Sequence, residues 1–268
     1  MNNFLRRISM KSGIGLTPRE DAVCRRLSAH YEIGSRYKRI YHYHIRKTGG
    51  TSINQMFLGL AGVPGREVYA GISRSFSLRM VVNDKVFVGW NRRLIEQGHY
   101  YYAFSHMPLH QISIPDNTFT ITCLREPVGR LLSHYKMLLD YQEAGVTRVD
   151  LKEELGWLGG SFSYFVSNLP RRHLQRQLYM FSDRYDLAEA LDMVMNCSCV
   201  LFTHTLGQDA NKLAQRLKLN LQLEHTRRSS RNLRLSEGDL ELAHTALEPE
   251  LRWYEEVEKQ KLALNEGR

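Results

Sequence analysis

Short apolar runs alternate with longer amphipathic segments along the chain, and this alternation predicts the secondary structure. Runs rich in β-branched and aromatic residues predict strands at 39–45, 85–90, 101–106, 118–123 and 199–203. Between and after these runs, apolar residues recur at the spacing of one helix face. Strands separated by helical segments are typical of parallel sheets. We therefore expect an α/β fold: a single domain with a mainly parallel central sheet flanked by helices.

Capping signals place several helix ends. The segment 17–20, TPRE, is a capping box with proline at the first helical position, and it predicts a helix running toward His30. Helical spacing predicts three further helices, over 50–60, 187–196 and 206–219. The segment 236–239 predicts another helix start, and we expect Pro249 to separate that helix from the last one.

No repeat or low-complexity linker interrupts this pattern. With 268 residues, 43% of them hydrophobic, the chain is long enough for one domain with a sizeable core. We expect residues 1–38 to form an N-terminal extension with one helix and residues 39–268 to form the domain.

The net charge of +9 suits anionic partners such as a nucleotide or another acidic molecule. Nucleic acid would also suit this charge, but the chain has no zinc-finger spacing, RNP-like segment or basic heptad array, so no nucleic-acid partner is expected. The four cysteines lack the spacing of a disulfide framework or a metal site, so reduced thiols are expected. Cys123, inside a predicted strand, is expected to pack in the core.

No apolar run approaches the roughly 18–20 residues of a membrane span, and no signal-peptide core is present. We therefore expect no stable membrane span or anchor and a bacterial-type cytoplasmic location. The start of the chain is basic and poor in acids, so a targeting peptide is the alternative there.

The segment 41–52, YHYHIRKTGGTS, combines a strand, a glycine turn and a helix start. Backbone N–H groups at a helix N-terminus favour a bound phosphate, and glycines let the backbone approach it closely. The segment therefore predicts an anion cradle. In ATP- and GTP-binding loops the lysine follows the glycines, whereas here Lys47 precedes Gly49 and Gly50.

A second anion site is predicted at 118–130, TFTITCLREPVGR. Pro127 fits the first turn of a helix, so Arg125 would lie at the carboxyl end of a strand and Ser133 about two turns into the helix. Ligands of open α/β sheets bind at that edge. An arginine at this edge can offer an anion a bidentate pair of donors.

Together the two motifs resemble those of sulfotransferases that use 3'-phosphoadenosine 5'-phosphosulfate (PAPS). KTGGTS resembles their 5'-phosphosulfate loop, and LREPVGRLLSHY resembles their 3'-phosphate motif. The resemblance is closest to the carbohydrate sulfotransferases of family 2 and is sharp over about 41–141. Arg46 stands where the family usually has proline, and Gly129 where it often has serine. The resemblance implies a P-loop-like sulfotransferase fold, PAPS as donor, its desulfated form PAP as product, and no metal.

The resemblance also assigns roles to residues. Lys47 would stabilise the charge on the leaving oxygen during an in-line displacement. The loop and the second motif would bind the nucleotide through Arg46, Lys47, Thr48, Gly49, Gly50, Thr51, Ser52, Arg125 and Ser133. The late segment 224–234 loosely resembles the one that closes over the nucleotide, and it adds Ser229 and Arg231.

An acceptor hydroxyl must lose a proton as it attacks, and histidine suits this task at neutral pH. His106 ends a predicted strand where this branch of the family carries its catalytic histidine, although Ser105 stands in place of the usual glycine. We expect His106 to be the base, with a structural histidine as the alternative. His44 is the next candidate base, and we expect it to pack beside the loop. Glu126 is expected to cap a helix or to orient Arg125.

The acceptor is expected to be a small molecule or a glycan, with a carbohydrate hydroxyl foremost. The aromatic residues at 100–102, Trp90 and Trp157 could stack on a sugar or belong to the core. Arg172 or Arg176 could meet an anionic acceptor, or form a solvated helix face. A kinase-like phosphotransferase and a non-catalytic nucleotide-binding relative are the alternative functions, and the sequence leaves the oligomeric state open.

Overall fold

The computed structural model describes residues 18–34, 36–146, 149–223 and 233–266. It confirms the predicted fold class, an α/β domain with a mainly parallel six-stranded sheet and flanking helices. Contacts group the chain into two compact units. The sheet unit comprises Met1–His44, Gly49–Cys123 and Asn196–Thr226, and the helical unit comprises Ile45–Thr48, Leu124–Met195 and Arg227–Arg268. The predicted boundary at residue 39 stays a prediction.

The strands run in the order β2-β3-β4-β1-β5-β6 across the sheet. Their bounds are β1 Arg39–Tyr43, β2 Arg79–Val82, β3 Lys85–Gly89, β4 Tyr102–Ser105, β5 Thr118–Leu124 and β6 Cys199–Phe202. β1 lies between β4 and β5 and is parallel to both, while β2 is antiparallel to β3. The two strands that lead into the predicted anion motifs, β1 and β5, are therefore neighbours whose carboxyl ends meet at one edge of the sheet.

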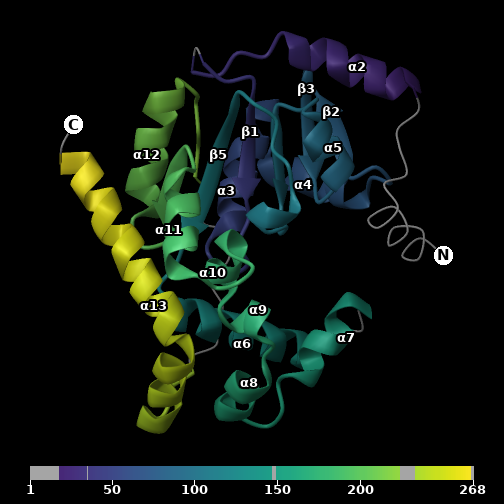
Figure 1. Cartoon of the computed structure of the whole chain (residues 1–268). Coiled ribbons are helices and arrows are strands. Elements are labelled where there is room, and N and C mark those ends of the chain that lie inside the picture. The colour runs from purple at the N-terminus through teal and green to yellow at the C-terminus, as the bar shows by residue number, and fades with distance from the viewer. Residues whose placement is uncertain (1–17, 35, 147–148, 224–232, 267–268) are drawn as a thin grey trace. The chain divides into compact units, whose positions relative to one another are not determined.

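Helices of the sheet unit surround these strands (Figure 1). They are α2 Pro18–Ala29, α3 Gly50–Leu58, α4 Gly65–Arg74, α5 Arg92–Gln97 and α12 Leu206–Leu217, with 3-10 turns at Gly59–Ala61 and Leu109–Gln111. One face of β1 contributes Ile40 to a buried cluster with side chains of α3, α4 and α12. Phe57 of α3 stacks on Tyr102 of β4 with ring centroids 4.8 Å apart. Burying each such ring stabilises the fold by about 1.5–3 kcal/mol.

The helical unit consists of α6 Pro127–Glu143, α7 Val149–Gly156, α8 Phe162–Asn168, α9 Arg171–Leu174, α10 Arg176–Phe181, α11 Leu187–Met195 and α13 Glu237–Glu266. Its core is a second apolar cluster, built where α6, α8 and α13 pack together, and it includes Leu131, Phe165 and Leu247. Pro127 is the first residue of α6, as predicted.

The prediction that Pro249 separates two helices is wrong, because α13 continues through it to Glu266. Proline removes one backbone hydrogen bond and normally breaks a helix. Here buried side chains on both sides of Pro249, among them Leu247 and Trp253, hold one helical path. Tertiary packing therefore outweighs the local cost.

Other differences concern element boundaries. Between the helix predicted over 50–60 and the strand predicted at 101–106, the sequence predicts only the strand at 85–90, yet this region also contains α4, β2 and α5. Gly65 permits the close packing of α4 on α3, since a Cβ there would lie 1.9 Å from the carbonyl oxygen of Gln55. α12 ends at Leu217 rather than residue 219 because Lys218 takes a left-handed conformation with φ of 54°. The predicted helix over 50–60 ends at Leu58 and continues as a 3-10 turn.

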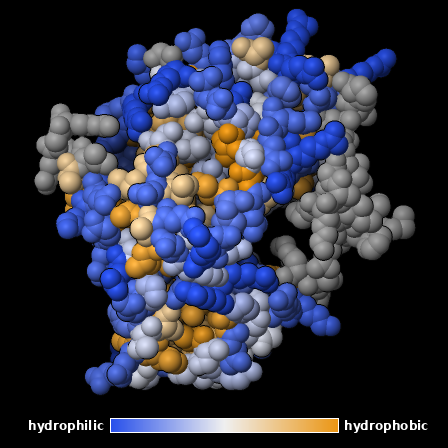
Figure 2. Space-filling view, viewed as in Figure 1, coloured by the Kyte–Doolittle hydropathy of each residue, from blue (hydrophilic) through white to orange (hydrophobic). Residues whose placement is uncertain are grey.

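Figure 2 shows a face dominated by hydrophilic side chains, with apolar ones gathered in separate groups. The exposed large hydrophobic residues are scattered over several elements: Val23, Val63, Phe76, Val81, Tyr164, Leu240 and Leu262. Within the described parts of the chain, no helix has the length and apolar character needed to cross a membrane. None of the four cysteines, all of which lie in the described residues, forms a disulfide. Cys123 is buried in β5, as predicted.

Candidate active site

The loop after β1 has an unusual backbone. Lys47 and Gly49 adopt left-handed conformations, with φ of 72° and 82°. This conformation costs a residue with a side chain about 1–2 kcal/mol, and such strain clusters at functional sites. Lys47 therefore holds a position that local sterics disfavour.

The first turn of α3 presents backbone donors. Ser52 and Ile53 donate to the Gly49 carbonyl at 3.0 and 3.3 Å, so the N–H groups of Gly50 and Thr51 precede the first helical hydrogen bond. Gly49 is the N-cap, and no side chain caps this helix. An anion near this end of α3 would meet the positive end of the helix dipole.

His44 packs against the start of α3, as predicted. A Cβ at Gly50 would lie 2.0 Å from His44 Cδ2 and 2.3 Å from Nε2, so no larger residue than glycine fits. His44 is buried, and its Nε2 edge faces the first residue of the helix. The second loop glycine is thus required by contact with an imidazole and not by its φ.

A buried polar network lies behind His44. Asn54 of α3 is fully buried, and its Oδ1 lies 2.8 Å from both the Tyr102 hydroxyl and His42 Nδ1. Its Nδ2 lies 3.1 Å from His44 Nδ1. Burial lowers the pKa of His42 to about 4, so His42 is neutral at physiological pH. The sequence gives no signal for this network apart from the alternating histidines His42 and His44.

His106, which follows β4, is the predicted base. Its Nδ1 lies 2.6 Å from the His44 carbonyl oxygen, and a carbonyl only accepts, so Nδ1 donates its hydrogen. In the neutral ring the lone pair is then on Nε2. The two imidazoles are 4.4 Å apart between centroids. Ser105 accepts from the Met107 N–H at 3.1 Å and bonds the Tyr41 hydroxyl at 2.7 Å, which shapes the turn that carries His106.

In the helical unit, the structure brings Lys47 and Arg125 together. Arg125 Nη1 donates to the Lys47 carbonyl at 3.4 Å. Gln177 of α10 holds the Arg125 backbone from both sides: its Oε1 accepts from the Arg125 N–H and its Nε2 donates to the Arg125 carbonyl, each at 2.8 Å. No motif in the sequence around Gln177 indicates this role.

Glu250 of α13 supports this arrangement. Its carboxylate accepts from the backbone N–H groups of Gln177 and Leu178 at 2.9 and 3.2 Å, and it lies 3.5 Å from Arg130 Nε. Glu250 and Arg130 are buried, and burial raises the pKa of Glu250 against the opposing effect of Arg130. The sequence could have indicated Glu250, because it is an acidic residue on the same helix face as the apolar residues Ala243, Leu247 and Tyr254.

Arg46, the loop's departure from the family pattern, forms an ion pair. Its Nη1 lies 2.5 Å from Glu154 Oε1, and His134 Nε2 lies 3.5 Å from Glu154 Oε2. Burial favours a higher pKa for Glu154, but the hydrogen bonds from His134 and Arg46 outweigh it and lower the pKa to about 2. The extra charge on the loop is therefore balanced by a carboxylate.

The remaining residues predicted from the sequence differ in burial and in hydrogen bonding. Thr48 is buried, and its hydroxyl hydrogen is donated to the Ile45 carbonyl at 3.0 Å. Ser133 is half-buried on α6. Glu126 caps α6 by accepting from the N–H groups of Val128 and Gly129 at 2.7 and 2.6 Å. Ser229 and Arg231 lie outside the described residues.

The aromatic candidates for sugar stacking belong to the core. Tyr100, Tyr101 and Tyr102 are buried, so the core alternative holds for them. Trp90 packs edge-on against Phe104 with ring centroids 4.8 Å apart. Trp157 is half-buried and lies 4.7 Å from the His173 ring.

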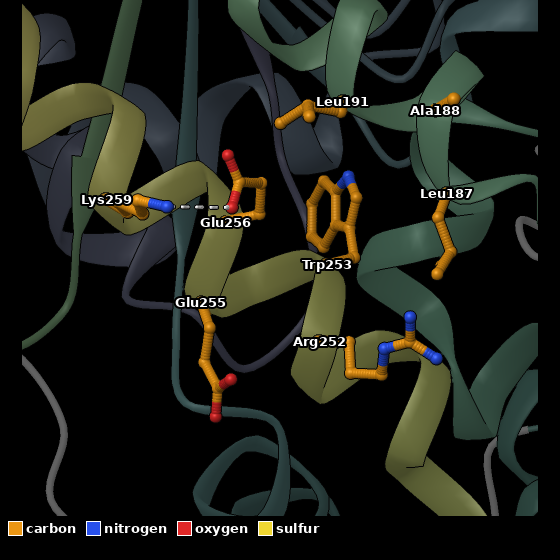
Figure 3. A pocket seen from close by; sticks show the side chains of 8 residues that line it. All are labelled: Leu187, Ala188, Leu191, Arg252, Trp253, Glu255, Glu256 and Lys259. Atoms are coloured by element: carbon orange, nitrogen blue, oxygen red, sulfur yellow. Dashed lines mark ion pairs between the residues drawn. The ribbon is translucent and has the colours of Figure 1, made fainter.

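A cavity of about 520 Å³ opens between α11 and α13 in the helical unit (Figure 3). Trp253 faces Leu187 and Leu191 there, and Lys259 pairs with Glu256 at 3.9 Å. Its lining residues are Leu187, Ala188, Leu191, Arg252, Trp253, Glu255, Glu256 and Lys259. None of the residues predicted to bind the nucleotide or to act in catalysis lines it.

No cluster of three or more histidine, cysteine or acidic side chains suited to a metal ion occurs in the portion of the chain that the structure describes.

A family model described as the sulfotransferase family matches residues 30–264 of the 268-residue chain. The chain therefore belongs to the sulfotransferase family. No curated protein matches the chain. The mainly parallel sheet agrees with a sulfotransferase fold, and membership supports a transferase whose general activity is sulfuryl transfer.

Proposed function

We propose that this protein transfers a sulfuryl group from PAPS to an acceptor hydroxyl by in-line displacement. The observation that carries the proposal is the 3.4 Å approach of Arg125 Nη1 to the Lys47 carbonyl. It brings together one cationic residue from each anion motif. A donor with phosphates at both its 5' and 3' positions needs such a pair, whereas a nucleotide without a 3'-phosphate does not.

The donor set of the loop fits phosphate groups. The backbone N–H groups of Gly49, Gly50 and Thr51, with the hydroxyls of Thr51 and Ser52, would hold the 5'-phosphate, and Thr48 would contribute its N–H. Arg125 and Ser133 would hold the 3'-phosphate. Arg46, whose Nη1 already pairs with Glu154, would add positive charge beside the loop. We also propose nucleotide contacts from Ser229 and Arg231 on the resemblance alone.

Two side chains would carry the chemistry. PAPS, once bound, supplies the activated sulfuryl group, and Lys47 would stabilise the charge that develops on the leaving oxygen. His106 would accept the proton of the attacking hydroxyl on Nε2. A positioned base of this kind contributes about 10²–10⁴-fold to the rate. The mechanism uses no metal.

The acceptor is proposed to be a hydroxyl of a glycan or small molecule, with carbohydrate first on the family resemblance. The cytoplasmic location likewise stays a prediction from sequence. A kinase-like phosphotransferase is the second candidate, and the position of Lys47 before the glycines disfavours it. A non-catalytic nucleotide-binding relative is the third.

Calorimetric titration with PAP, compared with ATP and magnesium, tests the donor assignment. We expect PAP to bind with a Kd of about 1 μM or below and ATP to bind much more weakly. Preference for ATP, or no binding of PAP to folded protein, would overturn the proposal. Turnover with PAPS in the presence of a chelator would then separate the sulfotransferase from a magnesium-dependent kinase. If no acceptor in a screen gave turnover with PAPS, the non-catalytic relative would be favoured.

A further inference from the structure

We propose that Asn54 gives the neighbouring histidines opposite roles: it holds His44 as a neutral N–H donor and leaves His106 as the proton acceptor. The role of His106 rests on the proposed function. The protonation states do not, because they follow from hydrogen bonds within the sheet unit and can be measured without nucleotide.

The first step is the orientation of the Asn54 amide. His42 Nε2 is buried and has no hydrogen-bond partner among the described residues. A buried N–H without an acceptor is rarer and more costly than a buried lone pair without a donor. His42 therefore carries its hydrogen on Nδ1, 2.8 Å from the Asn54 side-chain oxygen. Tyr102 donates to the same oxygen at 2.8 Å.

The second step follows from this orientation. With its oxygen facing His42 and Tyr102, Asn54 presents Nδ2 to His44 Nδ1 at 3.1 Å. An amide nitrogen only donates, so His44 Nδ1 must accept and the ring hydrogen must be on Nε2. Protonating Nδ1 would place two N–H groups face to face. Asn54 therefore keeps His44 neutral and unsuited to act as a base.

The third step concerns His106. Its Nδ1–H donates to the His44 carbonyl at 2.6 Å, and this hydrogen bond survives when Nε2 gains a proton. A carbonyl acceptor stabilises the resulting imidazolium. His106 can thus take the hydroxyl proton as the acceptor oxygen bonds to sulfur and the sulfur–oxygen bond to the phosphate breaks, with its electron pair going to the phosphate. His44 presents its Nε2–H edge to Gly50 at the start of α3.

Nitrogen–proton correlation spectra of the protein with ¹⁵N-labelled histidine measure these states directly. At neutral pH and without nucleotide, we expect His44 to be protonated on Nε2 only and His106 on Nδ1 only. His44→Gln and His106→Gln spectra assign the signals. A His44 ring protonated on Nδ1 would overturn the role of Asn54, whatever the outcome of the PAP titration.

Asn54→Asp provides a second arm. Its carboxylate can only accept, so we expect the His44 hydrogen to move to Nδ1 while the His106 signals keep their pattern. An unchanged His44 spectrum in folded Asn54→Asp protein would contradict the proposal. Since Asn54 is fully buried, this variant could fail to fold, and the wild-type spectrum then decides the question alone.

Matched glutamine variants test the division of roles. His106→Gln should lower kcat by about 10²-fold or more, the contribution of a base, while the Kd for PAP stays within about twofold. His44→Gln keeps an N–H donor and should lower kcat less than tenfold. His110→Gln, at an exposed position, is the control. If His44→Gln instead has the larger effect on kcat with PAP binding intact, the roles are reversed and the proposal fails.

Discussion

At the residue scale, Lys47 combines a side-chain amine proposed to act in catalysis with a backbone conformation that lowers stability. Its φ of 72° is disfavoured for any residue with a Cβ, so the loop stores strain at the residue proposed to stabilise the leaving group. Side-chain loss and strain relief can therefore be measured apart.

Lys47→Ala and Lys47→Gly form a matched pair. Both lose the amine, so we expect both to lose nearly all turnover with PAPS. Glycine also tolerates the left-handed conformation. The free energy of unfolding of Lys47→Gly, measured with denaturant, should therefore equal that of Lys47→Ala or exceed it by up to about 1 kcal/mol. Near-normal turnover in either folded variant would contradict the assigned mechanism.

Arg125 is expected to act mainly on nucleotide affinity. Hydrogen bonds to charged groups contribute about 1.5–3 kcal/mol, so Arg125→Ala should weaken PAP binding by about 10–100-fold in calorimetry. Arg184→Ala removes the same charge from an exposed position that pairs with Glu189 and is the control. An unchanged Kd for PAP in Arg125→Ala would count against its 3'-phosphate role.

At the element scale, α13 shows how packing can override a local signal. Pro249 lies inside a continuous helix whose buried face includes Glu250 and Trp253. The element therefore carries both an apolar core contact and the carboxylate that supports Gln177 and Arg130.

Pro249→Ala should stabilise the protein. Alanine restores the backbone donor that proline lacks and removes the ring clash, a gain of up to about 3 kcal/mol. Urea unfolding would measure it, with Glu248→Ala on the exposed face as the control. Lower stability in Pro249→Ala would show that the proline is required for the path of α13.

At the scale of the whole molecule, buried histidines predict a loss of stability in acid. Burial lowers the pKa of His42 and His134 to about 4 from 6.5. Between these values the unfolded chain binds the protons that the folded protein excludes. The stabilisation is therefore complete above about pH 6.5 and is lost as the pH falls toward about 4.

We expect the free energy of unfolding to fall between about pH 6.5 and pH 4 by up to about 1.4 kcal/mol per pH unit for each of these histidines. The depressed pKa of Glu154, about 2, predicts a second loss that begins below the unfolded carboxyl pKa of about 4.3. Urea unfolding at a series of pH values would show both. A flat profile from pH 6.5 to pH 4 would contradict the neutral buried histidines.

The sequence by itself determined the two anion motifs, the strands β1 and β5 that lead into them and the start of α6. These features depend on local patterns: β-branched runs, a glycine turn and a proline after a strand. The roles of Lys47, Arg125 and His106 stay predictions from that level.

Only the tertiary structure decided which partners hold these residues. Gln177 is 52 positions from Arg125, and Tyr102 is 48 positions from Asn54. It also decided that α13 continues through Pro249 and that Tyr100 to Tyr102 belong to the core. Local periodicity specifies which face of an element is apolar, but it does not specify which distant side chain meets that face. The buried hydrogen-bond partners therefore depend on the tertiary structure and could not be predicted from local sequence patterns.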